Sequence, residues 1–178
     1  MIRPSRRKFL AAGICVPIAA CARRGNSRRF LTAGEARTLE AVCAQIIPED
    51  QDPGAVQAGV VRFMDIQLTR FYKPLQKIYR RGIAQLNQAS VDFAGKPFAD
   101  LPAAQQLAVL HHIETNTELK PFFDLLVAHT MQGFYGDPRH GGNRERVSWK
   151  MVGLPYPPLR GRLRYDFADL ARGELPWR

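Results

Sequence analysis

Four histidines are the side chains of this 178-residue chain best suited to acid–base or metal chemistry: His111, His112, His129 and His140. Adjacent His111 and His112 would point about 100° apart on a helix, and neither has a second His or Cys four residues further on to complete a metal-binding face. The sequence contains no Cys-x-x-Cys-His haem site, no Gly-x-Gly-x-x-Gly dinucleotide loop and no Gly-x-Ser-x-Gly nucleophile elbow. We therefore expect no metal, no cofactor and no catalytic residue in this chain.

Asp137 and His140 are spaced as an acid–base pair could be, but a structural role is the favoured interpretation. Asp137 is expected to cap the turn before Pro138, and His140 to pack or form hydrogen bonds within the same loop. The next two residues, Gly141-Gly142, could hold an anion through backbone N–H groups, although two glycines alone are weak evidence for such a site. Cys43 falls on an apolar helix face and is expected to be a small buried hydrophobic residue.

The elements that position these residues are predicted to be helices, because apolar residues recur at three- and four-residue spacing. Thr32 and Glu35 form a capping box at the start of a first helix, which Pro48 ends. Further amphipathic helices are predicted at 56–71, 75–86, 100 or 101 to 113, and 121–134. No segment alternates apolar and polar residues for long enough to predict a strand. The fold class is therefore all-α, a compact bundle of about five amphipathic helices.

The helical periodicity also predicts which side chains form the core. Arg80 and Arg81 are placed on the solvent side of the third helix. The positions assigned to inner faces are Ala36, Leu39, Val42, Cys43, Ile46, Ile47, Val56, Val60, Phe63, Met64, Leu68, Phe71, Leu75, Ile78, Tyr79, Ile83, Leu86, Leu107, Leu110, Ile113, Phe122, Phe123, Leu126, Val127, Thr130, Met131 and Phe134.

The composition changes after Gly133. Residues 133–158 contain five glycines and four prolines in 26 positions, which excludes a long helix or a central strand. The same stretch keeps large side chains that a solvated linker would lack: Phe134, Tyr135, Trp149, Met151, Leu154 and Tyr156. A long loop of this kind either covers the helical core or binds a partner, since aromatic residues and Arg are enriched at the centres of interfaces.

Positive charge is concentrated at the N-terminus of a chain that has 26 Lys and Arg against 16 Asp and Glu. No acidic residue precedes Glu35, and basic residues flank a charge-free run of 14 residues from Phe9 to Ala22. This pattern is typical of an export signal. The twin-arginine signal, which exports folded proteins, is matched by Ser5, Arg6, Arg7, Phe9 and Leu10. We predict a twin-arginine signal peptide and basic linker at 1–31, and a single helical domain at 32–178 that is rich in loops after 133.

Other interpretations of the N-terminus are weaker. A nucleic-acid-binding arm would need no apolar run, so no nucleic-acid partner is expected. A permanent anchor would need about 20 apolar residues, and Pro17 would interrupt a short helix. The cleavage position stays open, because Ala20-Cys21-Ala22 fits cleavage between small residues whereas Ile18–Cys21 resembles a lipoprotein box; we favour the absence of lipidation on Cys21.

The loop region resembles a known family. Phe122-Phe123, His129-Thr130, the run from Gly133 to Arg144 that contains Asp-Pro-Arg-His-Gly-Gly-Asn-Arg, Trp149 and Gly153-Leu154-Pro155 resemble the gluconate 2-dehydrogenase subunit 3 family. The likeness extends upstream through Ile46-Ile47-Pro48, Ala58-Gly59-Val60 and Gly95-Lys96-Pro97-Phe98, and covers residues 32–157. Three positions depart from it: Tyr135 where Phe is common, His140 where Tyr is common, and Tyr156 where a glycine often stands.

The resemblance implies the small subunit of a bacterial membrane-bound, FAD-dependent sugar or alcohol dehydrogenase. In that family the flavoprotein large subunit lacks an export signal and passes the twin-arginine translocase on the signal of its small partner. A c-type cytochrome subunit then delivers the electrons to membrane quinones. By this resemblance the chain is a periplasmic, non-catalytic assembly chaperone and export escort, and FAD is bound by its partner.

On this hypothesis the loop is the partner-binding surface. The residues assigned to it are Phe134, Tyr135, Asp137, Arg139, Asn143, Arg144, Trp149 and Leu154. In the alternative hypothesis the chain contributes to the oxidoreductase active site, and the substrate entrance is lined by Asp137, Arg139, His140 or Asn143. A weaker third possibility is a free-standing exported binding protein.

Overall fold

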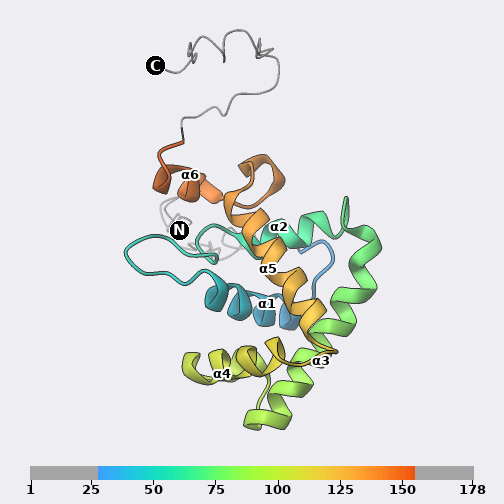
Figure 1. Cartoon of the computed structure of the whole chain (residues 1–178). Coiled ribbons are helices and arrows are strands. Elements are labelled where there is room, and N and C mark those ends of the chain that lie inside the picture. Colours follow the sequence, from blue (N-terminus) through green and yellow to red (C-terminus); the bar gives the residue numbers. More distant parts are fainter. Residues whose placement is uncertain (1–27, 155–178) are drawn as a thin grey trace, which may run out of the picture.

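The structure is a computed structural model that describes residues 28–154. The predicted signal residues Ser5, Arg6, Arg7, Phe9 and Leu10, and Cys21 with its open cleavage position, lie outside the described residues. Within residues 28–154 every regular element is helical, which confirms the all-α prediction (Figure 1). The α-helices are α1 (Ala33–Ile46), α2 (Val60–Gln67), α3 (Gln76–Ala94), α4 (Ala103–Glu114), α5 (Lys120–Tyr135) and α6 (Val147–Met151).

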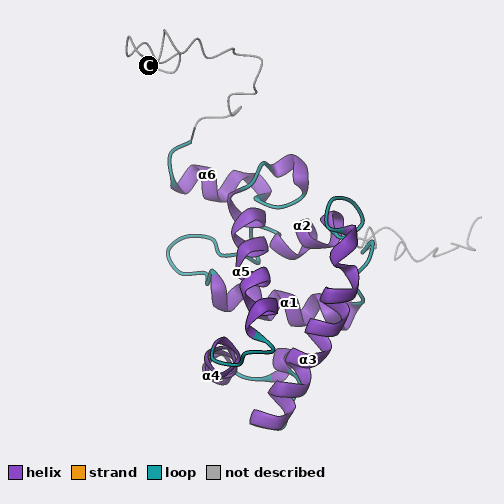
Figure 2. Ribbon diagram, turned by 45° about the vertical axis from the view of Figure 1, so that its right-hand side comes forward, coloured by secondary structure: helices purple, strands orange, loops and turns teal. Residues whose placement is uncertain are grey.

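Helix α5 runs through the middle of the molecule (Figures 1 and 2). It packs against α1, α2, α3, α4 and α6, and α1 also packs against α2. Helix α4 lies at one end of the bundle and α6 at the other (Figure 2). The largest fully buried side chains include Tyr79, Phe98, Phe134, Leu39 and Met64. No helix between residues 28 and 154 is long and apolar enough to cross a bilayer.

Helix α1 begins as its sequence predicts. The Thr32 side chain accepts from the backbone N–H of Glu35, and the Glu35 carboxylate accepts from the backbone N–H of Thr32 at 2.8 Å, which completes the capping box. Cys43 is fully buried on the inner face of this helix, so its assignment as a core residue is confirmed. Burial raises the pKa of its thiol to about 12.

Helix α2 is shorter than predicted. Gly59 precedes it with φ of 70°, a left-handed conformation that interrupts helical geometry, so the helix starts at Val60 and not near Val56. The far end is also earlier: the helix ends at Gln67, and the residues that follow form turns, with the N–H of Arg70 and of Tyr72 both donating to the Gln67 carbonyl. Val56 and Phe71 are consequently exposed, and their assignment to the core was wrong.

Helices α3 and α5 approach each other closely at Gly82. A Cβ atom at this position would lie 2.4 Å from Cγ of Phe122, so the absence of a side chain on α3 makes room for the ring from α5. Arg80 and Arg81 face solvent as predicted. Ile78, assigned to the core, is instead exposed at the edge of this contact.

Helix α4 starts later than predicted and α5 starts close to its predicted position. Residues 98–100 form a short 3-10 turn, and Pro102 is the N-cap of α4 rather than a residue of its first turn. Leu107 and Met131 were expected in the core but are exposed. Met131 follows the buried Thr130 and is therefore rotated by about 100° away from the face that packs inward.

Candidate partner-binding site

The loop that follows α5 opens with a turn capped by Asp137. Asp137 Oδ1 accepts the backbone N–H of Arg139 at 2.9 Å, and Oδ2 accepts Arg139 Nε at 2.9 Å. The hydrogen bond from the Arg139 side chain holds the pKa of Asp137 below its ordinary value. This confirms the capping interpretation. His140 is anchored through its backbone, because its carbonyl accepts Gln67 Nε2 at 3.2 Å while its ring is exposed.

Gly141 and Gly142 let the loop lie directly on α2 and α5. Gly141 has φ of 107°, and a Cβ atom there would lie 2.6 Å from Cδ1 of Ile66. A Cβ atom at Gly142 would lie 2.1 Å from the carbonyl oxygen of Gly133. Both glycines are buried. Close backbone packing therefore explains this pair, and the anion-binding interpretation is not needed.

Asn143 ties the two ends of the loop together from a fully buried position. Its backbone N–H donates to the carbonyl of Gly133 at 2.9 Å, and its Nδ2 donates to the carbonyl of Gly136 at 3.0 Å. Its Oδ1 accepts the backbone N–H of Ser148 at 3.1 Å. One side chain thus joins the end of α5 to the start of α6.

The backbone around Asn143 is strained. Asn143, Glu145 and Arg146 have φ values of 44°, 56° and 61°, in the left-handed region that side-chain-bearing residues seldom occupy. A residue held in this way requires surrounding contacts that determine its conformation, and such residues cluster at functional sites. Two of those contacts reach the body of the molecule: Arg144 N–H donates to the carbonyl of Ala58 at 2.9 Å, and an Arg62 N–H donates to that of Gly141 at 2.9 Å.

Helix α6 is fixed to α5 by two side chains. Ser148 Oγ donates to the carbonyl of Phe134 at 2.6 Å, and Trp149 Nε1 donates to the carbonyl of Tyr135 at 2.8 Å. The carbonyl of Trp149 in turn accepts the N–H of Leu154 at 2.8 Å. Trp149 therefore links Tyr135 through its indole and Leu154 through its backbone carbonyl, and both of these linked residues are exposed.

The eight residues assigned to partner binding fall into two groups. Phe134, Asn143 and Trp149 are buried and hold the loop in place. Tyr135, Arg139, Arg144 and Leu154 are exposed, and Asp137 is partly exposed. Met151 and Val152, neither of which was assigned to the surface, are exposed apolar residues on the same short segment. The assignment to a partner interface stays a prediction, and the exposed residues are those able to make direct contact.

A polar cluster that the sequence does not reveal lies beneath the loop, where His129 of α5 meets two tyrosines. Tyr79 Oη is 2.7 Å from His129 Nδ1, and the Tyr72 ring stacks on the His129 ring with centroids 4.0 Å apart. Tyr72 Oη also donates to Gln132 on α5. Burial lowers the pKa of His129 and raises that of Tyr79, because neither charged form is well solvated there.

The other two histidines lie on the surface of α4 and separate from each other. His111 Nδ1 is 3.7 Å from a carboxylate oxygen of Glu114, and the His112 ring stacks on Phe93 of α3. Among the described residues no three His, Cys, Asp or Glu side chains are grouped as a metal ion would require.

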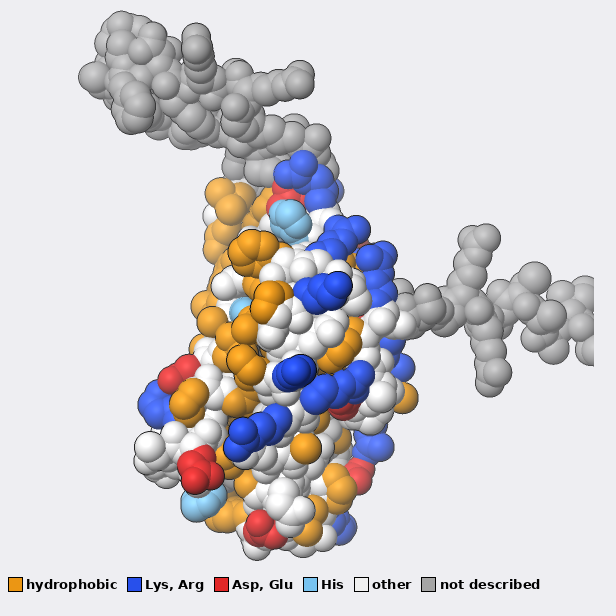
Figure 3. Space-filling view, turned by 90° about the vertical axis from the view of Figure 1, so that its right-hand side faces the viewer, with side chains coloured by type: hydrophobic (Ala, Val, Ile, Leu, Met, Phe, Trp, Pro, Cys, Tyr) orange, Lys and Arg blue, Asp and Glu red, His pale blue; other side chains and the backbone are white. Residues whose placement is uncertain are grey.

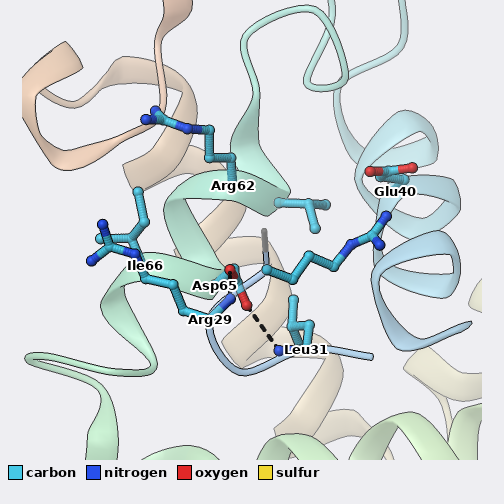
Figure 4. A pocket seen from close by; sticks show the side chains of 8 residues that line it. Arg29, Leu31, Glu40, Arg62, Asp65 and Ile66 are labelled. Carbon is cyan, nitrogen blue, oxygen red and sulfur yellow. Dashed lines mark hydrogen bonds between the residues drawn. The ribbon is translucent and has the colours of Figure 1, made fainter. Parts of the chain in front are cut away.

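Asp65 is the second feature that sequence reasoning missed. Its carboxylate is almost fully buried and accepts three successive backbone N–H groups, from Arg29, Phe30 and Leu31, at 2.7 to 2.9 Å. The carboxylate lies between α2 and the segment that leads into α1, beside a pocket of about 240 Å³ (Figure 4). The available signal was the position of Asp65, a charged residue in the middle of an apolar stretch, between Met64 and Ile66.

The helical body and the braced loop together form the unit that a family comparison matches. The model of the family described as gluconate 2-dehydrogenase subunit 3 matches residues 33–155, which include every described α-helix and the whole loop. The chain therefore belongs to the gluconate 2-dehydrogenase subunit 3 family. Members of this family are accessory subunits of a multi-subunit, membrane-bound dehydrogenase complex. No curated protein and no solved structure matches the chain.

Proposed function

We propose that this chain is the non-catalytic small subunit of a periplasmic FAD-dependent sugar or polyol dehydrogenase. It acts as an assembly chaperone for the flavoprotein large subunit and carries that subunit through the twin-arginine translocase on its own signal. FAD belongs to the large subunit, and a c-type cytochrome subunit accepts the electrons. The family membership supports the complex, and the Ser5–Leu10 motif supports the export route.

The observation that carries the proposal is an ordered loop that presents exposed apolar side chains. Asn143, Ser148 and Trp149 fix the loop to α5 from inside, whereas Tyr135 and Leu154, whose backbones bond to Trp149, are 43% and 54% exposed. Exposed apolar groups on a pre-ordered backbone favour binding, because little conformational entropy is lost when the partner docks. The left-handed residues of the loop are consistent with such a use.

Export of the partner is the most direct test. The full chain is co-expressed with the proposed flavoprotein large subunit, and FAD-containing large subunit is measured in the periplasm. Replacing both Arg6 and Arg7 by Lys should leave the large subunit folded, loaded with FAD and retained in the cytoplasm. Arg3→Lys, just ahead of the motif, is the matched control and should export normally. Normal export of the large subunit with the double variant would contradict the escort role.

The docking surface is tested with exposed residues, since substitution of buried ones would also disturb the loop. Tyr135→Ala and Leu154→Ala should each lower recovery of the large subunit in a pull-down, by about tenfold or more if the residue is a hot spot. Leu107→Ala, which truncates a similarly exposed leucine on α4, is the matched control. Normal recovery with an altered KM of the assembled enzyme would instead place the loop at the substrate entrance.

A further inference from the structure

Residues 66–91 form a long basic segment that runs from the end of α2 into α3. No Asp or Glu occurs in the 26 residues between Asp65 and Asp92, although this stretch contains five cations: Arg70, Lys73, Lys77, Arg80 and Arg81. It covers the end of α2, the turn that follows and most of α3. Figure 3 views the side of the molecule on which α3 lies, and shows Lys and Arg side chains gathered across it with hydrophobic side chains between them.

Most of these cations are available to an external anion. Arg80 is engaged, because it pairs with Glu35 and lies over the Phe30 ring. Among residues 28–154 no ion pair involves the remaining four, all of which are exposed: Arg70, Lys73, Lys77 and Arg81. Within the described part of the chain, none of these four cations is neutralised by a direct ion pair.

Phe71 stands within this basic segment and is 83% exposed, the highest value among the large hydrophobic side chains described. The turn that carries it is firmly held. The neighbouring Tyr72 points inward against His129, its N–H donates to the carbonyl of Gln67 at 2.8 Å, and Gln76 Nε2 donates to the carbonyl of Leu68 at 2.8 Å. Phe71 is thus presented outward by an ordered backbone.

We propose that the corner formed by Arg70, Phe71, Lys73, Lys77 and Arg81, the basic corner, binds the surface of a bilayer that contains anionic phospholipid. The cations contact the headgroups, and the Phe71 ring enters the boundary between headgroups and acyl chains. Residues 66–91 contribute no carboxylate that the same surface would repel, and Glu118 is an acidic residue from outside the segment that lines a pocket with Arg81. Lipid binding at this corner does not depend on the proposed binding of the flavoprotein.

Lipid fits this corner better than a protein does. A protein interface usually closes around its aromatic anchor in a pocket and is depleted in Lys. Here one aromatic side chain protrudes from a convex turn, and Lys73 and Lys77 are two of the four cations around it. A fluid bilayer needs no matching pocket to accept a single aromatic ring. The negatively charged headgroup phosphates attract each cation that comes close to the surface.

Vesicle binding by the full chain tests the electrostatic part. Vesicles of equal phosphatidylglycerol and phosphatidylcholine are compared with phosphatidylcholine alone. Each cation near an anionic surface is worth about fivefold in binding, so Lys73→Glu with Lys77→Glu should weaken binding by more than about twentyfold. The matched control, Lys96→Glu with Lys150→Glu, changes the net charge equally and should change binding far less. The cations ahead of residue 28 contribute equally to vesicle binding by the two double variants. An equal loss of vesicle binding in the two double variants would therefore overturn the proposal.

Insertion of the ring is tested separately. Phe71→Trp should be quenched by brominated lipid in anionic vesicles, whereas Phe93→Trp, at an exposed position near the far end of α3 and outside the basic corner, should add no quenching. Phe71→Ala should lower vesicle binding about fivefold or more while the helical content is unchanged, since the side chain is exposed. If Phe71→Ala binds vesicles normally but no longer recovers the flavoprotein, the corner is a protein interface and the proposal is wrong.

Discussion

Asp65 Oδ1 accepts the backbone N–H of Leu31 at 2.8 Å, although the two residues are 34 positions apart in the chain. With the bonds from Arg29 and Phe30, this carboxylate receives three adjacent donors that precede the first helix. Hydrogen bonds to an ionised acceptor are about twice as strong as neutral ones. The Asp65 side chain therefore attaches the segment that precedes α1 to α2.

Asp65→Asn should weaken this attachment, because the amide keeps one acceptor oxygen and turns an NH2 group towards backbone donors. We expect a loss of about 1–3 kcal/mol in the free energy of unfolding, measured by urea denaturation. Amide hydrogens at 29–31 should exchange faster, whereas those in α5 should change only with global stability.

The control is Asp124→Asn, which alters an exposed pair with Lys120 and should cost less than about 1 kcal/mol. Equal effects of the two substitutions, or unchanged exchange at 29–31, would mean that the Asp65 carboxylate does not hold this segment.

The buried His129 makes stability depend on pH. Because burial lowers its pKa below the ordinary value of 6.5, the unfolded chain binds a proton more readily than the folded one. Stability is therefore complete above the unfolded pKa and falls as pH drops below about 6.5. Thermal unfolding at pH 7.5 and 5.5 should show this loss, and His129→Gln should reduce it. His111→Gln, at an exposed histidine, is the matched control, and a loss as small in this variant as in His129→Gln would contradict the role of His129.

The sequence predicted helix positions well where a local signal marked them. The Thr32 and Glu35 capping box, Pro48, and the Pro121 start of the last long helix all stand within a few residues of the observed boundaries. The start of α2 was missed because it depends on Gly59 in a left-handed conformation, and the sequence pattern does not show the φ of a glycine. Exposed Met131 and Leu107 were placed inside because apolar character alone does not identify the packed face.

The sequence predicted which segment forms the candidate site, but not which of its side chains point inward and which face solvent. Glycine, proline and aromatic content located the loop, yet only the fold shows that Asn143 and Trp149 point inward while Tyr135 and Leu154 face solvent. The bond between Tyr79 and His129 joins residues 50 positions apart, and no periodicity within either helix could indicate it. Long-range polar contacts of this kind arise from how the helices pack, and a single sequence does not show which residues meet in space.

The thiol of Cys43 should not react with thiol reagents while the protein is folded. Its thiol is fully buried, lies 3.4 Å from Thr130 Oγ1, and has its pKa raised to about 12 by burial, so thiolate is scarce at pH 8. In a variant with Cys15 and Cys21 replaced by Ala, reaction with an aromatic disulfide reagent should follow the rate of unfolding. Fast labelling under native conditions, at a rate proportional to reagent, would show that α1 opens locally around this residue.

Gly142→Ala should disrupt the loop, because the new methyl group would lie 2.1 Å from the Gly133 carbonyl oxygen, a backbone atom with no freedom to withdraw. We expect a loss of about 2 kcal/mol or more, together with reduced protection of the Asn143 amide, which donates to that same carbonyl. Gly34→Ala is the matched control: no atom lies within 4 Å of its added Cβ, and alanine favours the helix by about 0.5–1 kcal/mol. The two changes should therefore shift the melting temperature in opposite directions. If Gly142→Ala also binds the flavoprotein less well while Gly34→Ala does not, the rigid loop is needed for docking; full stability of Gly142→Ala would show that the loop can leave α5 at no cost.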